Sequence, residues 1–117
     1  PAPKIEVSAG TPATINDPAL VAKVVPFLQA AVGKENVQTV EPTMGAEDFG
    51  LFSQGGVPIF MFRLGTIPPE KVAEARAKEQ PLPSLHSALY HPDARPSIKT
   101  GVHAMSSAVI GLLPPKK

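Results

Sequence analysis

Proline is the feature of this sequence that most limits its fold, because prolines are both frequent and scattered. Fifteen of the 117 residues are proline, about 13%, against about 5% in an average protein. They are spread along the chain, so they do not form a proline-rich linker or a PxxP ligand. Since proline fixes its own backbone angle and interrupts helices and strands, the sequence predicts short elements joined by stiff connections.

Composition excludes several classes of protein. The 11 Lys and Arg residues balance the 10 Asp and Glu residues, so no broad basic face is available for nucleic acid. The chain has no cysteine, which excludes a disulfide scaffold and a thiolate zinc finger. No apolar run approaches the ~20 residues of a membrane helix. We therefore expect no nucleic-acid or membrane partner. Because the first residue is Pro1 rather than methionine, we expect a cut or processed chain, and the compartment stays open.

The pattern of apolar residues predicts alternating strands and helices. Polar–apolar alternation or an apolar run predicts three strands, over residues 4–9, 37–40 and 57–64. Helical spacing and start or stop signals predict four helices, over residues 18–32, 46–54, 69–80 and 96–113. The run 57–64 is typical of a central strand buried on both faces. The order predicts an α/β fold in which helices pack on a mixed sheet.

The first predicted helix has clear boundaries and one irregularity. Asn16 and Asp17 are capping residues, and Pro18 follows them in the first turn, where its missing N–H costs nothing. Gly33 is a plausible stop. Pro26 lies inside the helix, where we expect it to kink the helix or to split it in two.

Three places could hold chemistry. Glu47 and Asp48 are adjacent carboxylates at a predicted helix start, Gly65 and Thr66 follow the apolar strand, and His86 lies in a proline-bounded loop. Each also has a simpler interpretation: acids at a helix start are often caps, a glycine after a strand often marks a turn, and a loop histidine is often a surface residue. From the residues alone these alternatives stay open.

No complete catalytic motif is present. A catalytic zinc needs about three protein ligands, and the sequence has no His-x-x-x-His on a helix. It also lacks a G-x-S-x-G elbow, a P-loop and a G-x-G-x-x-G motif. His91 shares the loop of His86, and His103 lies on the last predicted helix. The residues alone therefore do not build a metal site.

Several strings in order resemble one enzyme family. They are TINDP at 14–18, MGAEDF at 44–49, VP at 57–58, FMFRLG at 60–65, LHS at 85–87, TGV at 100–102 and AM at 104–105. In this order and spacing they resemble the carboxyl-terminal part of metal-dependent amidohydrolases related to hippurate hydrolase, N-acyl-amino-acid amidohydrolase and auxin-conjugate hydrolase. That group belongs with the dinuclear zinc aminoacylases and carboxypeptidases.

The resemblance implies a domain organisation and a site. Residues 1–16 would be the last strand of a lid, or dimerisation, domain with its crossover, and residues 17–117 the carboxyl-terminal portion of the catalytic domain. His86 would be the one metal ligand from this part of the chain. The residues that would line the site, on the substrate side or behind the ligands, are Glu47, Asp48, Gly65 and Thr66.

The resemblance also implies a reaction. The parent enzyme would use two divalent ions (zinc, or manganese or cobalt) to hydrolyse the amide bond of an N-acyl amino acid or a small peptide. Its general base would lie in an amino-terminal half that this chain lacks, so we expect the chain alone to be inactive and to bind no ion.

Two expectations about partners follow. The lid strand at residues 4–9 would have lost its sheet partners, so it should pair with another copy or lie loose; we expect a homodimer or strand-exchanged self-association. The alternative function is a stand-alone, non-catalytic α/β binding or interaction domain.

Overall fold

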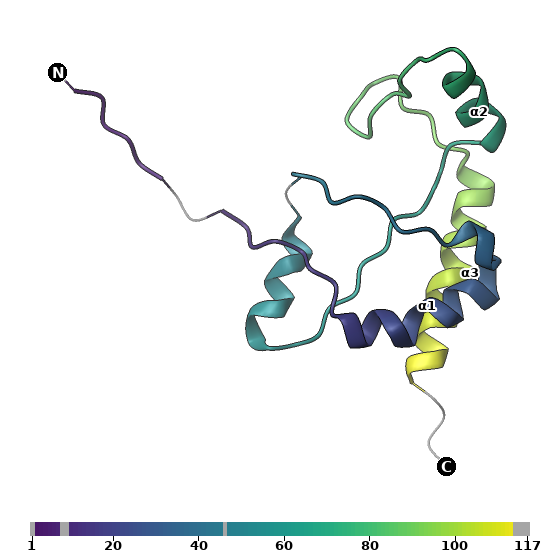
Figure 1. Ribbon diagram of the computed structural model, residues 1–117, viewed down its shortest axis with the longest axis horizontal. Coiled ribbons are helices and arrows are strands. Elements are labelled where there is room, and N and C mark those ends of the chain that lie inside the picture. The colour runs from purple at the N-terminus through teal and green to yellow at the C-terminus, as the bar shows by residue number, and fades with distance from the viewer. Residues whose placement is uncertain (1, 8–9, 46, 114–117) are drawn as a thin grey trace.

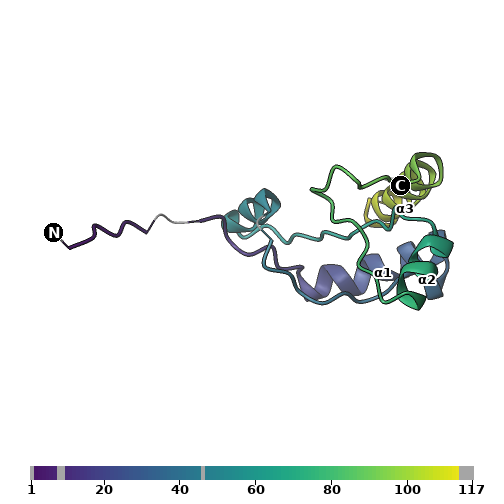
Figure 2. The same cartoon turned by 90° about the horizontal axis from the view of Figure 1, so that it is seen from above.

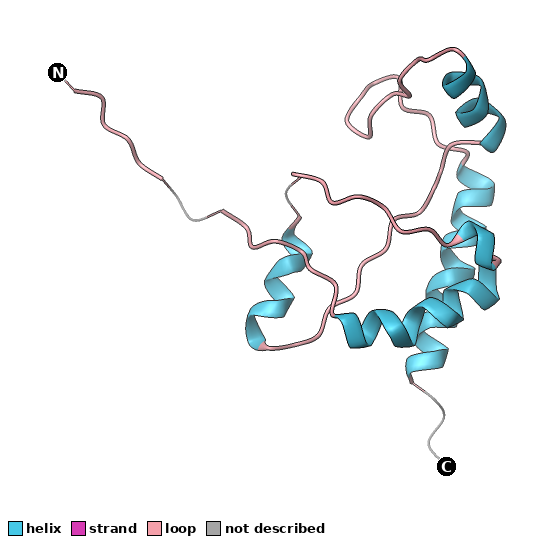
Figure 3. Cartoon of the chain, viewed as in Figure 1, coloured by secondary structure: helices cyan, strands magenta, loops and turns pink. Residues whose placement is uncertain are grey.

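The computed structural model describes residues 2–7, 10–45 and 47–113. It contains helices and connecting segments (Figures 1 and 3). The elements, in chain order, are α1 (Pro18–Val32), the 3-10 helix η1 (Lys34–Asn36), the 3-10 helix η2 (Asp48–Gly55), α2 (Pro69–Ala77) and α3 (Ala94–Leu112). No helix in the described ranges is both long and apolar enough to cross a membrane.

The predicted mixed sheet is wrong, because the described part of the chain contains no β-strand. The segment predicted to be a central strand, residues 57–64, is extended (Figure 1), but no other segment in the described ranges forms a ladder with it. A strand is defined by a neighbour that accepts and donates backbone hydrogen bonds. Local sequence favours the extended backbone, whereas the neighbour must come from elsewhere, and the described residues do not supply it.

A side chain takes the place of a neighbouring strand beside the extended segment. The amide of Asn16 donates to the C=O of Met61 at 2.8 Å, and its oxygen accepts from the N–H of Met61 at 2.7 Å. One residue further on, the N–H of Asp17 donates to the C=O of Ile59 at 2.9 Å. Ile59 is buried. These bonds join the start of α1 to the middle of the extended segment.

The first helix forms as predicted. The side chain of Asp17 accepts from the N–H of Leu20 at 2.8 Å and caps the helix. Gly33 ends it with a φ of 92°, a conformation that favours glycine. Pro26 lies inside α1, and the helix continues through it. Of the two outcomes expected at Pro26, the split is therefore wrong.

The core lies where α3 crosses α1. The buried residues of this cluster are Val24 and Leu28 of α1 and Ala104 and Ala108 of α3. The side chains of α3 at this contact are small, and the distance between two packed helices depends on the size of the side chains between them. The two helices can therefore approach closely. Gly111 continues this face of α3: a Cβ there would lie 2.5 Å from the ring of Phe27. The side chains of Phe60 and Phe62 pack against the same cluster.

A second face of α3 is uncovered. Its large apolar residues are exposed at helical spacing: Ile98, Val102, Met105, Val109 and Leu112. The whole chain exposes 9995 Å², whereas a compact monomer of its mass, 12.2 kDa, exposes about 6,100 Å². Figure 2 shows the reason, because the amino-terminal segment and η2 project to one side of the α1–α3 pair. Much apolar surface is therefore available to partners.

The remaining predicted elements differ from the observed ones in type or in length. The helix expected at 46–54 is the 3-10 helix η2, and the one expected at 69–80 ends at Ala77. Residues 37–40 have no secondary structure. The described part of the predicted strand 4–9, residues 4–7, projects from the body (Figure 1) with Ile5 and Val7 at 81% and 90% exposure; residues 8 and 9 lie outside the described ranges.

Candidate functional site

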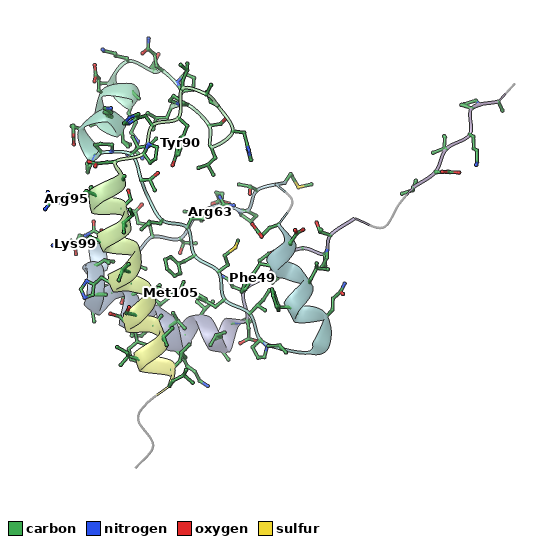
Figure 4. The ribbon with its side chains drawn as sticks, turned by 180° about the vertical axis from the view of Figure 1, so that it is seen from behind. Phe49, Arg63, Tyr90, Arg95, Lys99 and Met105 are labelled. Carbon is green, nitrogen blue, oxygen red and sulfur yellow. The ribbon has the colours of Figure 1, made fainter. Side chains whose placement is uncertain are left out.

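The carboxyl end of the extended segment is the place where three parts of the chain meet. Arg63 donates to the hydroxyl of Thr43 at 2.7 Å, across twenty residues of sequence. The hydroxyls of Thr66 and Tyr90 hydrogen-bond to each other, and the C=O of Thr66 accepts from the N–H of Asp93 at 2.8 Å. Figure 4 shows Arg63 between Tyr90 and Phe49. The segments before η2 and before α3 are therefore both bonded to this end.

His86 lies on a turn in the loop that Thr66 holds. The N–H of Ser87 donates to the C=O of Ser84 at 2.9 Å, which closes a four-residue turn with His86 at its third position. Tyr90 then donates its N–H to the C=O of Ser87 at 3.0 Å. The side chain of His86 is exposed. An imidazole presented on a closed turn is accessible to an ion or a partner outside the chain.

Glu47 and Asp48 occupy the start of η2. The carboxylate of Glu47 accepts from the N–H of Phe49 at 3.2 Å, so it caps the 3-10 helix. Asp48 is the first residue of η2. Both side chains are exposed. Of the two interpretations left open by the sequence, the structure shows the capping role for Glu47, and a role toward substrate stays a prediction.

The structure brings the predicted site residues together only in part. Thr66 is bonded to the loop that contains His86, but within the described ranges no hydrogen bond or ion pair joins His86 to Thr66, Glu47 or Asp48. No three His, Asp or Glu side chains in these ranges are grouped so that they could hold a metal ion. The described residues therefore do not fit a dinuclear centre by themselves. His86 could supply one imidazole ligand to a centre completed by other residues.

Two positioning residues were missed by the sequence reasoning. Tyr90 and Asp93 hold the His86 loop against Thr66. Tyr90 is the single tyrosine of the chain, and a lone tyrosine in a polar, proline-rich loop could have indicated a hydrogen-bonding role, since tyrosine hydroxyls usually find partners. Asp93 acts through its backbone, which no sequence signal identifies. His91 and His103 are exposed.

Comparison with family models identifies the class of protein. The model described as Peptidase family M20/M25/M40 matches residues 3–86, which is most of the chain and includes the extended segment and His86. The chain belongs to this peptidase family. Comparison with curated proteins and with solved structures gave no match. Members of the family are in general hydrolases that depend on two metal ions.

Proposed function

We propose that this chain is the carboxyl-terminal part of an amidohydrolase that cleaves the amide bond of N-acyl amino acids or small peptides. The family match over residues 3–86 is the observation on which the proposal depends. The strings around Glu47, Arg63 and His86 favour the hippurate hydrolase and aminoacylase group within that family. When two divalent ions are bound, they supply an activated water and polarise the scissile carbonyl.

In this proposal the residues of the chain position and complete a site that is formed mainly by other residues. His86 supplies one imidazole, which as a neutral ligand suits zinc, manganese or cobalt. Its turn is held by Tyr90 and Asp93 against Thr66, so the imidazole is presented from a fixed loop. We assign Glu47, Asp48, Gly65 and Thr66 to the substrate side of the site or behind the ligands.

The proposal is tested first on the chain alone. Because the described residues do not group three metal ligands, we expect the purified 117-residue chain to hydrolyse no N-acyl amino acid, with or without added zinc, manganese or cobalt. Hippurate and N-acetyl amino acids are suitable substrates, with release of the free amino acid as the readout. Metal-dependent turnover by the chain alone would show that its own residues form a sufficient site.

The second test distinguishes two histidines in the longer enzyme that the proposal implies. We expect His86→Ala to lower both turnover and metal content, by orders of magnitude in turnover, because one ligand is lost. His91→Ala, five residues along the same loop, is the matched control and should change turnover only slightly. If His91→Ala has the larger effect on both readouts, the assignment of His86 is wrong. A natural reading frame without further metal ligands would favour the alternative, a non-catalytic binding domain.

A further inference from the structure

Arg63 is a cation at the candidate site, and the described part of the chain gives it no acidic partner. Its side chain is exposed. Ion pairs are present in the described ranges, but none of them includes Arg63. The hydrogen bond that holds its guanidinium is donated to the hydroxyl of Thr43, at 2.7 Å. Because a hydroxyl is neutral, this bond orients the positive charge of Arg63 without neutralising it.

The extended backbone directs Arg63 away from the helices. Phe60 and Phe62 pack against the α1–α3 cluster. Successive side chains of an extended chain lie on opposite faces. Arg63, one residue after Phe62, therefore lies on the face opposite the cluster, and Figure 4 shows it between Tyr90 and Phe49.

The backbone beside Arg63 leaves room for a ligand. The next residue on the same face is Gly65, and a Cβ built there would meet no described atom within 4 Å apart from its chain neighbours. A larger side chain at this position would fill the space next to the guanidinium, whereas glycine leaves it open. The guanidinium of Arg63 therefore borders an open space at the carboxyl end of the extended segment.

We propose that Arg63 binds the carboxylate of the N-acyl amino acid and that Thr43 positions the guanidinium for this contact; the inference rests on the proposed function. A guanidinium presents five N–H donors in a planar fork that matches the two oxygens of a carboxylate. The bond to Thr43 uses one donor, which leaves enough for a bidentate contact. Since a free carboxylate is charged at neutral pH and a carboxamide is not, Arg63 would make the enzyme select the free acid.

A carboxylate elsewhere in the longer protein is the competing partner of Arg63. An ion pair within the protein would stabilise the fold and would affect all substrates alike, whereas a contact with substrate affects only substrates that have a carboxylate. Substrate is favoured because the open space at Gly65 lies next to Thr66, which is bonded to the loop that contains His86. The space is therefore beside the residues that we assign to the reaction.

The test compares an N-acyl amino acid with its neutral carboxamide on the longer enzyme that the proposed function implies. Hippurate and hippuramide are a suitable pair, with release of benzoate as the readout for both. We expect kcat/KM to be at least about tenfold higher for hippurate, because a hydrogen bond to a charged group is worth about 1.5–3 kcal/mol. Arg63→Met should remove most of this preference, mainly by raising KM for hippurate, and should leave kcat/KM for hippuramide nearly unchanged.

Arg95→Met is the matched control for the loss of charge. Arg95 is also exposed, and it lies on α3 away from Arg63 (Figure 4). We expect this variant to keep the preference for hippurate. A fall in the preference as large as that of Arg63→Met would show that net charge, and not a contact at Arg63, determines the selection of the acid, and would overturn the proposal.

Two variants of Thr43 test its positioning role. Thr43→Val removes the hydroxyl and keeps the charge of Arg63, so we expect KM for hippurate to rise about 2- to 10-fold while kcat/KM for hippuramide stays the same. Thr43→Ser keeps a hydroxyl and should restore the KM of the unmodified enzyme. An unchanged KM for hippurate in Thr43→Val would overturn the role of Thr43.

The outcomes distinguish this inference from the proposed function. If the enzyme hydrolyses both substrates equally, or if Arg63→Met leaves the preference for hippurate intact, the assignment of Arg63 is wrong and the proposed function stands. Equal losses on both substrates, with a lower free energy of unfolding in urea, would assign Arg63 to an ion pair within the protein and would also overturn the inference. If the unmodified enzyme hydrolyses no acyl amide, the proposed function is wrong and the inference falls with it.

Discussion

Asn16 offers the sharpest test of how this chain holds its extended segment. Its amide makes two hydrogen bonds to the backbone of Met61, at 2.8 and 2.7 Å, in a partly buried place. A hydrogen bond of this kind contributes about 1 kcal/mol net. Replacement of Asn16 by Ala should therefore lower the free energy of unfolding by about 2 kcal/mol. Asn36→Ala is the control, because that amide makes exposed bonds after α1 and should cost less than half as much.

The isosteric variant Asn16→Asp separates the donor from the acceptor. At neutral pH the introduced carboxylate still accepts from the N–H of Met61, but it presents a second oxygen to the C=O of Met61 where an N–H donor stood. We expect a loss at least as large as that of the Ala variant. Protonation restores a donor, so the folded state favours the neutral carboxyl. The loss relative to the unmodified chain should then grow as pH rises from about 4, the ordinary pKa of Asp, and should level off once the carboxyl is ionised in the folded state.

Urea unfolding followed by far-UV circular dichroism measures these differences, with the unmodified chain run at each pH. If Asn16→Ala lowers the free energy of unfolding by less than about 0.5 kcal/mol, water replaces the amide without cost. The two hydrogen bonds to Met61 would then not stabilise the extended segment. If the loss for Asn16→Asp does not depend on pH, the N–H of Asn16 that donates to the C=O of Met61 does not contribute to stability.

Two further substitutions test the helices. Asp17→Ala removes the cap on the N–H of Leu20 and should lower the free energy of unfolding by about 1 kcal/mol. Asp17→Asn keeps a capping side chain and should largely preserve the stability. Equal losses for the two variants in urea unfolding would contradict the capping role. Gly111→Ala places a Cβ 2.5 Å from the Phe27 ring and should cost about 1–3 kcal/mol through overpacking. Gly101→Ala, whose Cβ meets only a flexible methyl of Leu64 at 3.1 Å, should cost less, and the reverse order in thermal or urea unfolding would contradict the α1–α3 packing.

The helices were predictable because their signals are local. Asp17 followed by Pro18 begins α1 and Gly33 ends it, as expected from capping chemistry alone. Pro96 lies in the first turn of α3, which begins two residues before the predicted start. The 3-10 form of η2 was not predictable, since apolar spacing over eight residues does not distinguish it from an α-helix.

The sheet was not predictable from the apolar run, because strand pairing is a non-local property. The run does fix the extended backbone of 57–64, but the partner on its covered edge is the side chain of Asn16. The sequence pattern is typical of a helix cap at both Asn16 and Asp17, but a helix start uses one capping side chain. Asp17 caps α1, and Asn16 binds Met61 instead. At the candidate site, Thr66 is bonded to the loop that contains His86 through Tyr90 and the backbone N–H of Asp93, and the roles of these residues in a metal site stay predictions.

The α1–α3 core has a consequence for the order in which the chain can fold. Residues 33–93 separate the two helices whose side chains form this core, so α1 leaves the ribosome well before the helix it packs against. At about 5–20 residues per second, synthesis of the intervening segment takes seconds. During that time the apolar face of α1, including Val24 and Leu28, lacks the buried α3 residues of the cluster, Ala104 and Ala108. Nascent chains stalled before α3 should therefore recruit chaperones that bind apolar helices, and release them once α3 has emerged.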